Sequence, residues 1–119
     1  MVEQNAPQLD AVFHALSDPT RRGMLHALSQ SERSIGDLAT PYQMSFAGAS
    51  KHVRVLERAG LVRRRIVGRV HYCSLDAARL REAQQWLTHY ERFWTGRLDA
   101  LEQLLRTQDG SEQTQRSDR

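Results

Sequence analysis

Apolar residues recur at the spacing of one helical face along residues 9–56, and they predict four short helices. The apolar positions of these helices, in chain order, are Leu9, Val12, Phe13 and Leu16, then Met24, Leu25 and Leu28, then Ile35 and Leu38, and finally Ala49, Val53 and Leu56. Polar residues lie between them, so each helix has one face for a core and one face for solvent. Residues 1–7 lack this pattern and are expected to be flexible.

Capping residues set the boundaries of these helices. Asp18 and Pro19 predict the start of the second helix, because aspartate caps helices and proline loses no hydrogen bond at the first helical position. Ser34 and Ser45 are expected to cap the third and fourth helices. Gly60 suits the position after the fourth helix, because it can adopt the left-handed conformation that ends a helix. The third and fourth helices, joined by a brief turn, therefore form a predicted helix-turn-helix.

The hydrophobic period changes after Gly60. Residues 61–66 and 69–75 are rich in Val, Ile, Tyr and Arg, and they flank Val67-Gly68, which is expected to be a two-residue connection. A β-hairpin in this place is the wing of a winged helix-turn-helix. The fold class is therefore mainly α with a small β-hairpin: four helices, two strands and a terminal helix.

Residues 77–106 contain no proline and one glycine, so they predict a single helix about 45 Å long. A domain of this size has a radius of gyration of only about 13 to 14 Å, so the helix would overhang its own core and pair with the same helix of a second chain. The expected dimer contacts are Leu87, Tyr90, Trp94, Leu98, Leu101 and Leu105. The alternative is a helix bent at Gly96 that folds back within one chain. Residues 8–106 thus form one domain, and residues 107–119, without an apolar residue, are expected to be disordered.

Positive charge is concentrated in one segment. The chain has a formal net charge of +3, but residues 51–71 hold seven Lys or Arg and one acid, Glu57. This distribution indicates a polyanion bound at one place. Outside the segment, Arg21 and Arg22 fall in the first turn of the second helix, where a cation is unfavourable to the helix dipole. They are expected either to be solvated or to meet an acid or a phosphate.

The face of the fourth helix opposite its apolar stripe suits entry into a DNA groove. Ala47, Gly48 and Ser50 are small or polar and allow a close approach, and Lys51 and Arg54 follow them. Wing arginines could reach phosphates beside the same site; these are Arg63, Arg64, Arg65 and Arg69. The alternatives are a solvated basic helix face and a wing whose arginines only protect a sheet edge.

Three segments, HALSDPTRRGMLHAL, SIGDLA and MSFAGASKHVRVLERAGLVRRRIVGRVHYCSLD, resemble the ArsR/SmtB family of small dimeric winged-helix repressors. The resemblance covers about residues 10–76, and residues 93–105 resemble the dimer helix of members without an obvious metal site. It implies a transcriptional repressor, typically of its own operon. It also implies DNA contacts centred on Ser45, Ala47, Gly48, Ser50, Lys51, His52 and Arg54, with Gly68 and Arg69 in the wing. For His52, a phosphate contact and a packing role are both open.

The metal-binding motifs of the family are missing. Metal-sensing members carry a Cys-x-Cys-Asp-Leu motif on the third helix, where this chain has Ser34, Gly36 and Asp37. The other family site needs paired ligands on the last helix, and here His89 is followed three residues later by Arg92. No metal or cofactor is therefore expected. Cys73, the sole cysteine, is expected to be a small buried residue, because a redox or haem role needs an exposed thiol of low pKa.

The preferred function is a sequence-specific, dimeric repressor that reads an inverted repeat in double-stranded DNA, with half-sites roughly 34 to 36 Å apart. One alternative is a winged-helix module that binds an acidic protein. Another is a sensor that binds a metal, haem or small-molecule effector near Trp86, Tyr90 and Trp94. No catalytic motif is present, so an enzyme is not expected. Without a signal peptide or an apolar span, the protein is expected to be soluble and cytoplasmic.

Overall fold

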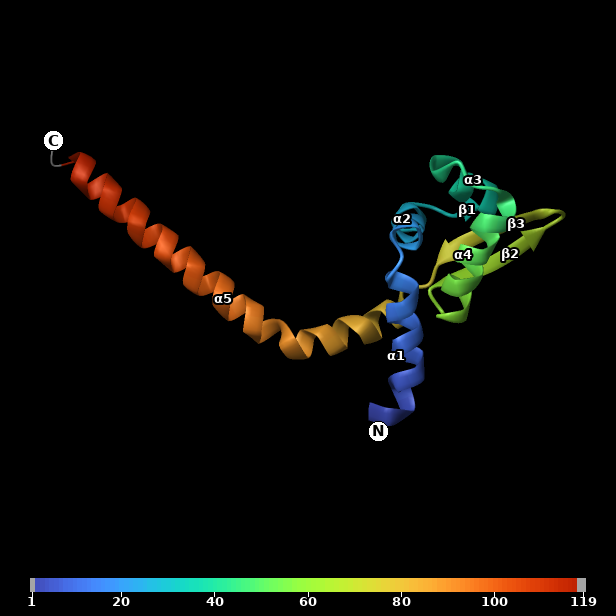
Figure 1. Cartoon of the computed structure of the whole chain (residues 1–119), viewed down its shortest axis with the longest axis horizontal. Coiled ribbons are helices and arrows are strands. Elements are labelled where there is room, and N and C mark those ends of the chain that lie inside the picture. Colours follow the sequence, from blue (N-terminus) through green and yellow to red (C-terminus); the bar gives the residue numbers. More distant parts are fainter. Residues whose placement is uncertain (1, 118–119) are drawn as a thin grey trace. The chain divides into compact units, whose positions relative to one another are not determined.

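The computed structural model describes the backbone of residues 2–117 and the side chains of residues 7–108. Its elements are α1 (Val2–Leu16), α2 (Pro19–Leu28), β1 (Arg33–Ser34), α3 (Ile35–Ala39), the 3-10 helix η1 (Thr40–Tyr42), α4 (Phe46–Arg58), β2 (Val62–Val67), β3 (Val70–Leu75) and α5 (Ala78–Ser117). These residues form two compact units, one up to Gln84 and one from Gln85 onward. The first unit contains the winged helix-turn-helix, in which α3, α4 and the sheet pack together (Figure 1). The predicted fold class is confirmed.

The core of the first unit joins the helices to the sheet. Val12 of α1, Met24 of α2 and Leu56 of α4 are completely buried, as are Leu61 and Cys73. Val12, Met24 and Leu56 are among the apolar positions that helical periodicity selects, and their burial removes one face of each helix from water. α4 is thereby fixed against α1, α2 and the sheet, and its other face stays exposed.

The predicted helix caps are present. The Asp18 carboxylate accepts a hydrogen bond from the Arg21 backbone N–H at 3.0 Å, and Ser34 and Ser45 cap α3 and α4 in the same way. Gly60 has a φ of +75°. Its N–H donates to the Glu57 carbonyl, and the next N–H, that of Leu61, donates to the carbonyl of Leu56. These two bonds form a Schellman motif that ends α4.

The sheet has three strands, not the two of the predicted hairpin. β1 pairs with β3, so that Arg33 lies opposite Cys73 and Ser34 opposite Tyr72, and the strand order is β1-β3-β2. The sequence pattern assigns Arg33 to a polar loop, because two residues are too few to show an alternation. The backbone of this loop therefore gains partners that no local pattern reveals.

The wing turn lies one residue later than predicted. Val67 pairs with Val70, so the two connecting residues are Gly68 and Arg69, not Val67 and Gly68. Gly68 has a φ of +62°, and Arg69 does not have a positive φ. A positive φ at the first turn position only is typical of a type II′ hairpin, which favours glycine there. This register places Arg69 at the tip of the wing.

Both terminal helices extend beyond their predicted ends. α1 begins at Val2 and runs through Pro7, and α5 continues past Arg106 to Ser117. Apolar periodicity could not detect the extension of α5, because residues 107–117 contain no apolar side chain. Flexibility of residues 1–7 and disorder of residues 107–119 stay predictions; residues 1, 118 and 119 lie outside the described part of the chain. Within that part, no helix is long and apolar enough to cross a membrane.

Candidate nucleic-acid interface

The exposed face of α4 carries a row of cations that follows the small residue Ala47. Ala47, Lys51, Arg54 and Arg58 follow one another at helical spacing, and all four are exposed, opposite the buried Ala49. Among the described side chains, no carboxylate forms an ion pair with the three cations of this row. We call Lys51, Arg54 and Arg58 the α4 cation row. Its charges are free to meet an external anion.

The other predicted contact residues of α4 lie in different environments. Ser45 is exposed, and its hydroxyl accepts a hydrogen bond from the Gly48 N–H at 3.1 Å. A side chain at Gly48 would lie 3.4 Å from that hydroxyl, so the small residue fits the cap. Ser50 is only 9% exposed, on the core side of the helix. The placement of Ser50 on the open face was therefore wrong, because its position at the border between the two faces is covered by neighbouring elements.

The wing arginines differ in their partners. Arg63 pairs with Asp76 at 3.0 Å, and Arg64, which is half-buried, pairs with Glu57 at 2.5 Å. Arg65 pairs with Glu32 at 2.7 Å, and its guanidinium lies 5.0 Å from the ring centre of Tyr72. The hydrogen bond that the Arg65 guanidinium donates to the Glu32 carboxylate raises the pKa of Arg65. These pairs hold the wing to α4, to the loop before β1 and to the start of α5.

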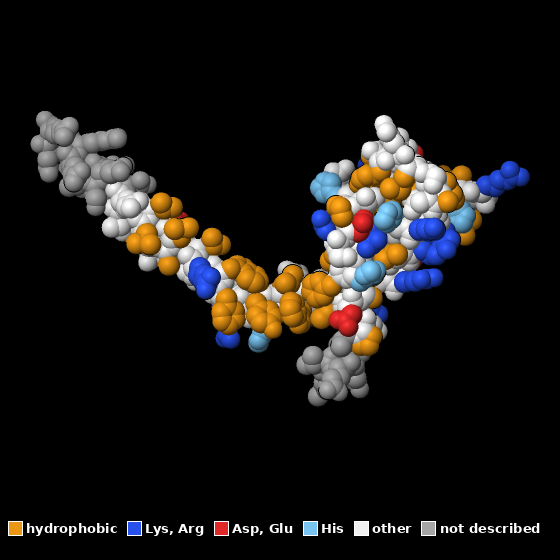
Figure 2. Space-filling view, in the orientation of Figure 1, with side chains coloured by type: hydrophobic (Ala, Val, Ile, Leu, Met, Phe, Trp, Pro, Cys, Tyr) orange, Lys and Arg blue, Asp and Glu red, His pale blue; other side chains and the backbone are white. Residues whose placement is uncertain are grey.

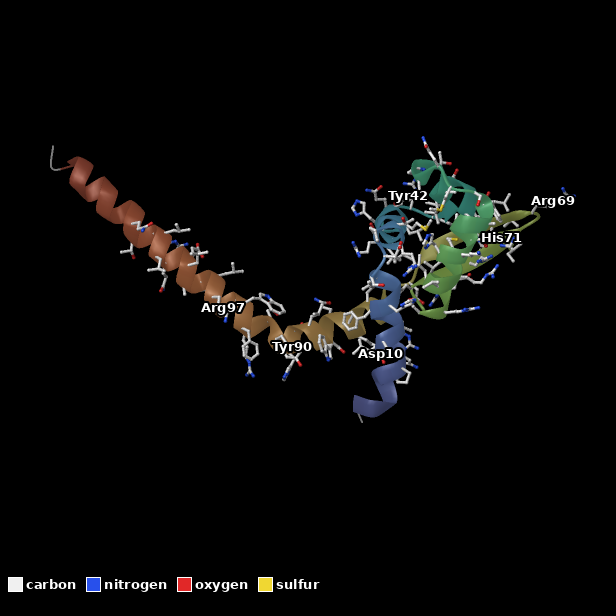
Figure 3. All side chains as sticks on the ribbon, viewed as in Figure 1. Asp10, Tyr42, Arg69, His71, Tyr90 and Arg97 are labelled. Carbon is white, nitrogen blue, oxygen red and sulfur yellow. The ribbon has the colours of Figure 1, made fainter. Side chains whose placement is uncertain are left out.

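Arg69 is the one wing arginine without an ion pair among the described side chains. It lies at the far end of the hairpin, as Figure 3 shows, beside the exposed Gly68. Figure 2 shows Lys and Arg side chains gathered on this part of the first unit. Among the described cations of α4 and the wing, only the α4 cation row and Arg69 at the wing tip have no ion pair with a described carboxylate.

Arg21 is a buried residue that the sequence interpretation missed. It is only 8% exposed. Its Nε donates to the Ala15 carbonyl at 2.8 Å, one terminal nitrogen donates to the His14 carbonyl at 3.0 Å, and the other lies 3.3 Å from His52 Nδ1. The Arg22 guanidinium donates to the Leu16 carbonyl at 2.7 Å. Neither arginine forms an ion pair with a described carboxylate. Both instead donate to carbonyls at the C-terminal end of α1, where a cation is favourable.

The second unit exposes an apolar row along α5. All six predicted dimer contacts lie on it and are between 39 and 60% exposed; they are Leu87, Tyr90, Trp94, Leu98, Leu101 and Leu105. The rings of Trp86 and Tyr90 are 4.9 Å apart, and Phe93 extends the aromatic cluster. This row is visible along α5 in Figure 2. Large apolar side chains exposed together mark an interaction surface.

Comparisons with known proteins agree with this geometry. A family model described as a helix-turn-helix domain matches residues 16–65. The transcriptional repressor SdpR of Bacillus subtilis is 30% identical over 82 residues, which is 69% of this chain and 91% of the repressor. An ArsR family transcriptional regulator of known crystal structure is 33% identical in sequence to this chain. The two structures match with a TM-score of 0.70, over 76% of this chain and 93% of that one. The chain belongs to the ArsR/SmtB family. It is a DNA-binding transcriptional regulator with a winged helix-turn-helix.

A third comparison concerns assembly. A homodimeric winged helix-turn-helix DNA-binding domain from Mycobacterium bovis, solved in solution, is 29% identical to this ArsR/SmtB member. The likeness covers 75% of this chain and 85% of that domain, with a TM-score of 0.61. At least one solved relative is thus a homodimer. Together, the comparisons confirm the family resemblance found in the sequence.

In this ArsR/SmtB member Cys73 lies on β3, with its side chain in the core, and is completely buried. Burial raises the pKa of the thiol to about 11, although the nearby Arg64 acts in the opposite direction. The thiol is therefore protonated at neutral pH, and a protonated thiol is a poor nucleophile and metal ligand. Among the residues that the structure describes, no three His, Cys, Asp or Glu side chains are grouped so that they could hold a metal ion.

Proposed function

We propose that this regulator is a homodimeric repressor that binds an inverted-repeat operator through α4 and the wing. The observation that supports this proposal is the separation of paired from unpaired cations. Arg63, Arg64 and Arg65 are held by carboxylates of the same chain, whereas no described carboxylate holds the α4 cation row or Arg69. Cations on a helix that fits the major groove of DNA, and on the hairpin next to it, suit the phosphates on either side of one DNA site.

The N-terminal turns of α4 supply the part of the interface that approaches the bases. Ala47 is exposed and small, and Gly48 adds no side chain to the same turn. They allow the backbone to come close to the groove floor, while the exposed Ser45 and the α4 cation row reach bases and phosphates. Arg65 adds a contact only when a phosphate replaces Glu32.

The apolar row of α5 supports a dimer. A second copy of α5 would cover side chains such as Leu98 and Leu101, which water surrounds in the single chain. The related Mycobacterium bovis domain is itself homodimeric. A two-fold dimer presents two copies of α4, which fit half-sites about 34 to 36 Å apart.

The test compares the full chain on its own upstream DNA and on scrambled DNA of equal length, at about 150 mM salt. A preference for the upstream DNA of about 10³-fold or more is expected of a specific regulator. The same titration with excess zinc and with a chelator shows whether a metal changes that preference. Equal, weak binding to both DNAs would contradict the proposal and favour a winged-helix module that binds an acidic protein.

A further inference from the structure

Three helices meet at the guanidinium of Arg21. The side chain extends from the first turn of α2, bonds the carbonyls of His14 and Ala15 at the end of α1, and reaches His52 in the middle of α4. It is buried, and each of its three nitrogens has one acceptor. A buried cation with a partner at each nitrogen resists displacement, since moving it would leave those acceptors unpaired.

The contact with His52 determines which ring nitrogen carries the proton. An arginine side chain only donates, so Nδ1 of His52 must accept the bond at 3.3 Å. A neutral imidazole whose Nδ1 accepts has its hydrogen on Nε2. His52 is therefore fixed in a ring orientation that leaves Nε2–H as its remaining donor.

Asp18 is the other charged group that faces this ring. One of its oxygens, Oδ2, accepts the Arg21 backbone N–H at 3.0 Å and lies 3.9 Å from His52 Nδ1, beyond hydrogen-bond distance. That backbone bond lowers the pKa of Asp18, so the carboxylate is ionised at neutral pH. Asp18 thus caps α2 and leaves Nδ1 of His52 to Arg21.

We infer that Arg21 is a positioning residue for DNA binding, and that it presents the Nε2–H of His52 to a DNA phosphate. This inference rests on the proposed function. The His52 side chain is 26% exposed and lies directly after Lys51, the first residue of the α4 cation row. A neutral donor beside that row suits a phosphate oxygen, which is the usual acceptor next to a groove-entering helix. The same contacts fix α4 to α1 and α2.

The first test replaces His52 by the two amides that imitate its two nitrogens. In His52→Gln the amide nitrogen occupies the place of Nε2, whereas in His52→Asn it occupies the place of Nδ1. We expect His52→Gln to bind the upstream DNA within about threefold of the unchanged protein and His52→Asn to bind about tenfold more weakly, as the loss of a charge-assisted hydrogen bond requires. The exposed His26, replaced in the same two ways, is the matched control and should leave affinity unchanged.

The second test reads the tautomer directly. Nitrogen NMR of the free protein at about pH 8, where histidine is neutral, should show His52 with its proton on Nε2. Met has no N–H to donate, and the single nitrogen of Lys cannot take the places of the three guanidinium nitrogens. In Arg21→Met and Arg21→Lys the two tautomers should therefore mix, and DNA affinity should fall about tenfold. If these variants do not fold, the His52 variants and the tautomer of the unchanged protein still show whether His52 offers its Nε2–H to DNA.

Equal DNA affinities of His52→Gln and His52→Asn, or a proton on Nδ1 in the unchanged protein, would overturn the inference. The proposed function would survive either result, provided that the unchanged protein still prefers its upstream DNA. Absence of that preference is a separate result and refutes the proposed function itself.

Discussion

The arginines of α4 and the wing differ in whether a carboxylate of the same chain already holds them. Arg54 and Arg69 have no ion pair among the described side chains, whereas Arg64 is bonded to both Glu57 and His71. An arginine that is already paired must give up its partner to bind a phosphate, and an unpaired one needs only to release solvent and counterions. Charge counted along the sequence cannot make this distinction.

Arg54→Ala and Arg69→Ala are each expected to weaken operator binding by about five- to tenfold. Each should also reduce the slope of log affinity against log salt concentration by about one. Thermal stability should stay unchanged, since neither side chain has an ion pair with a described carboxylate to lose. Binding titrations over a series of salt concentrations measure both effects. Arg81→Ala, an exposed arginine of α5 outside the candidate interface, is the matched control. Salt dependence like that of the unchanged protein would place the interface elsewhere.

The Cys73 thiol is expected to be unreactive in the folded protein. A thiol reagent at about pH 8 should modify it only after urea is added, because the site is completely buried and the pKa is raised to about 11. Because the pKa of the thiol is higher in the folded state than its ordinary value of 9.0, the protonated thiol contributes its full stability below pH 9.0. This contribution is lost as the pH rises through about 11. The stability difference between the unchanged protein and Cys73→Ala should therefore narrow above about pH 9. Fast modification without urea would refute the buried, protonated thiol.

The surroundings of two residues, Arg21 and Ser50, could not be predicted from the sequence pattern, and the reason is physical. The acceptors of Arg21 are carbonyls of α1, and their position depends on how α1 and α2 cross, not on local propensity. Ser50 lies at the edge of the apolar stripe, where the packing of neighbouring elements decides its burial. Helical periodicity ranks such border positions poorly.

At the scale of elements, local chemistry ends the recognition helix. Gly60 closes α4 through a Schellman motif in the left-handed conformation, and the side chain of Arg79 passes close to it. This helix end, like the cap at Ser45, was predictable because it depends on residues adjacent in sequence. β1 was not predictable, because its partner strand, β3, is distant in sequence.

Gly60→Ala is expected to destabilise the first unit by about 1 to 2 kcal/mol, because an alanine is strained at a φ of +75°. Its Cβ would also lie 2.9 Å from Arg79 Cγ. Gly96→Ala is the contrasting variant: it lies inside α5 with open space around it, so alanine should stabilise the helix by about 0.5 to 1 kcal/mol. Urea denaturation measures both changes. Equal effects of the two substitutions would contradict the assigned end of α4.

At the scale of the whole molecule, the apolar row of α5 determines assembly in the proposed account. The combined substitution of Leu98 and Leu101 by Glu should convert a dimer into a monomer, because two charges would be buried in each half of the interface. Gln103→Glu, on the opposite side of α5 by helical spacing, should leave the dimer intact. Light scattering of the full chain measures the mass. A dimer that survives the paired substitution would remove α5 from the interface.

The most direct test of the central claim is a hydroxyl-radical footprint of the full chain on its upstream DNA. We predict two protected segments on one face of the duplex, with their centres about 10 base pairs apart, as two copies of α4 in a two-fold dimer require. Arg54→Ala should weaken the protection of both segments equally. A single protected segment, or uniform protection along the fragment, would contradict the account of a dimer that reads an inverted repeat.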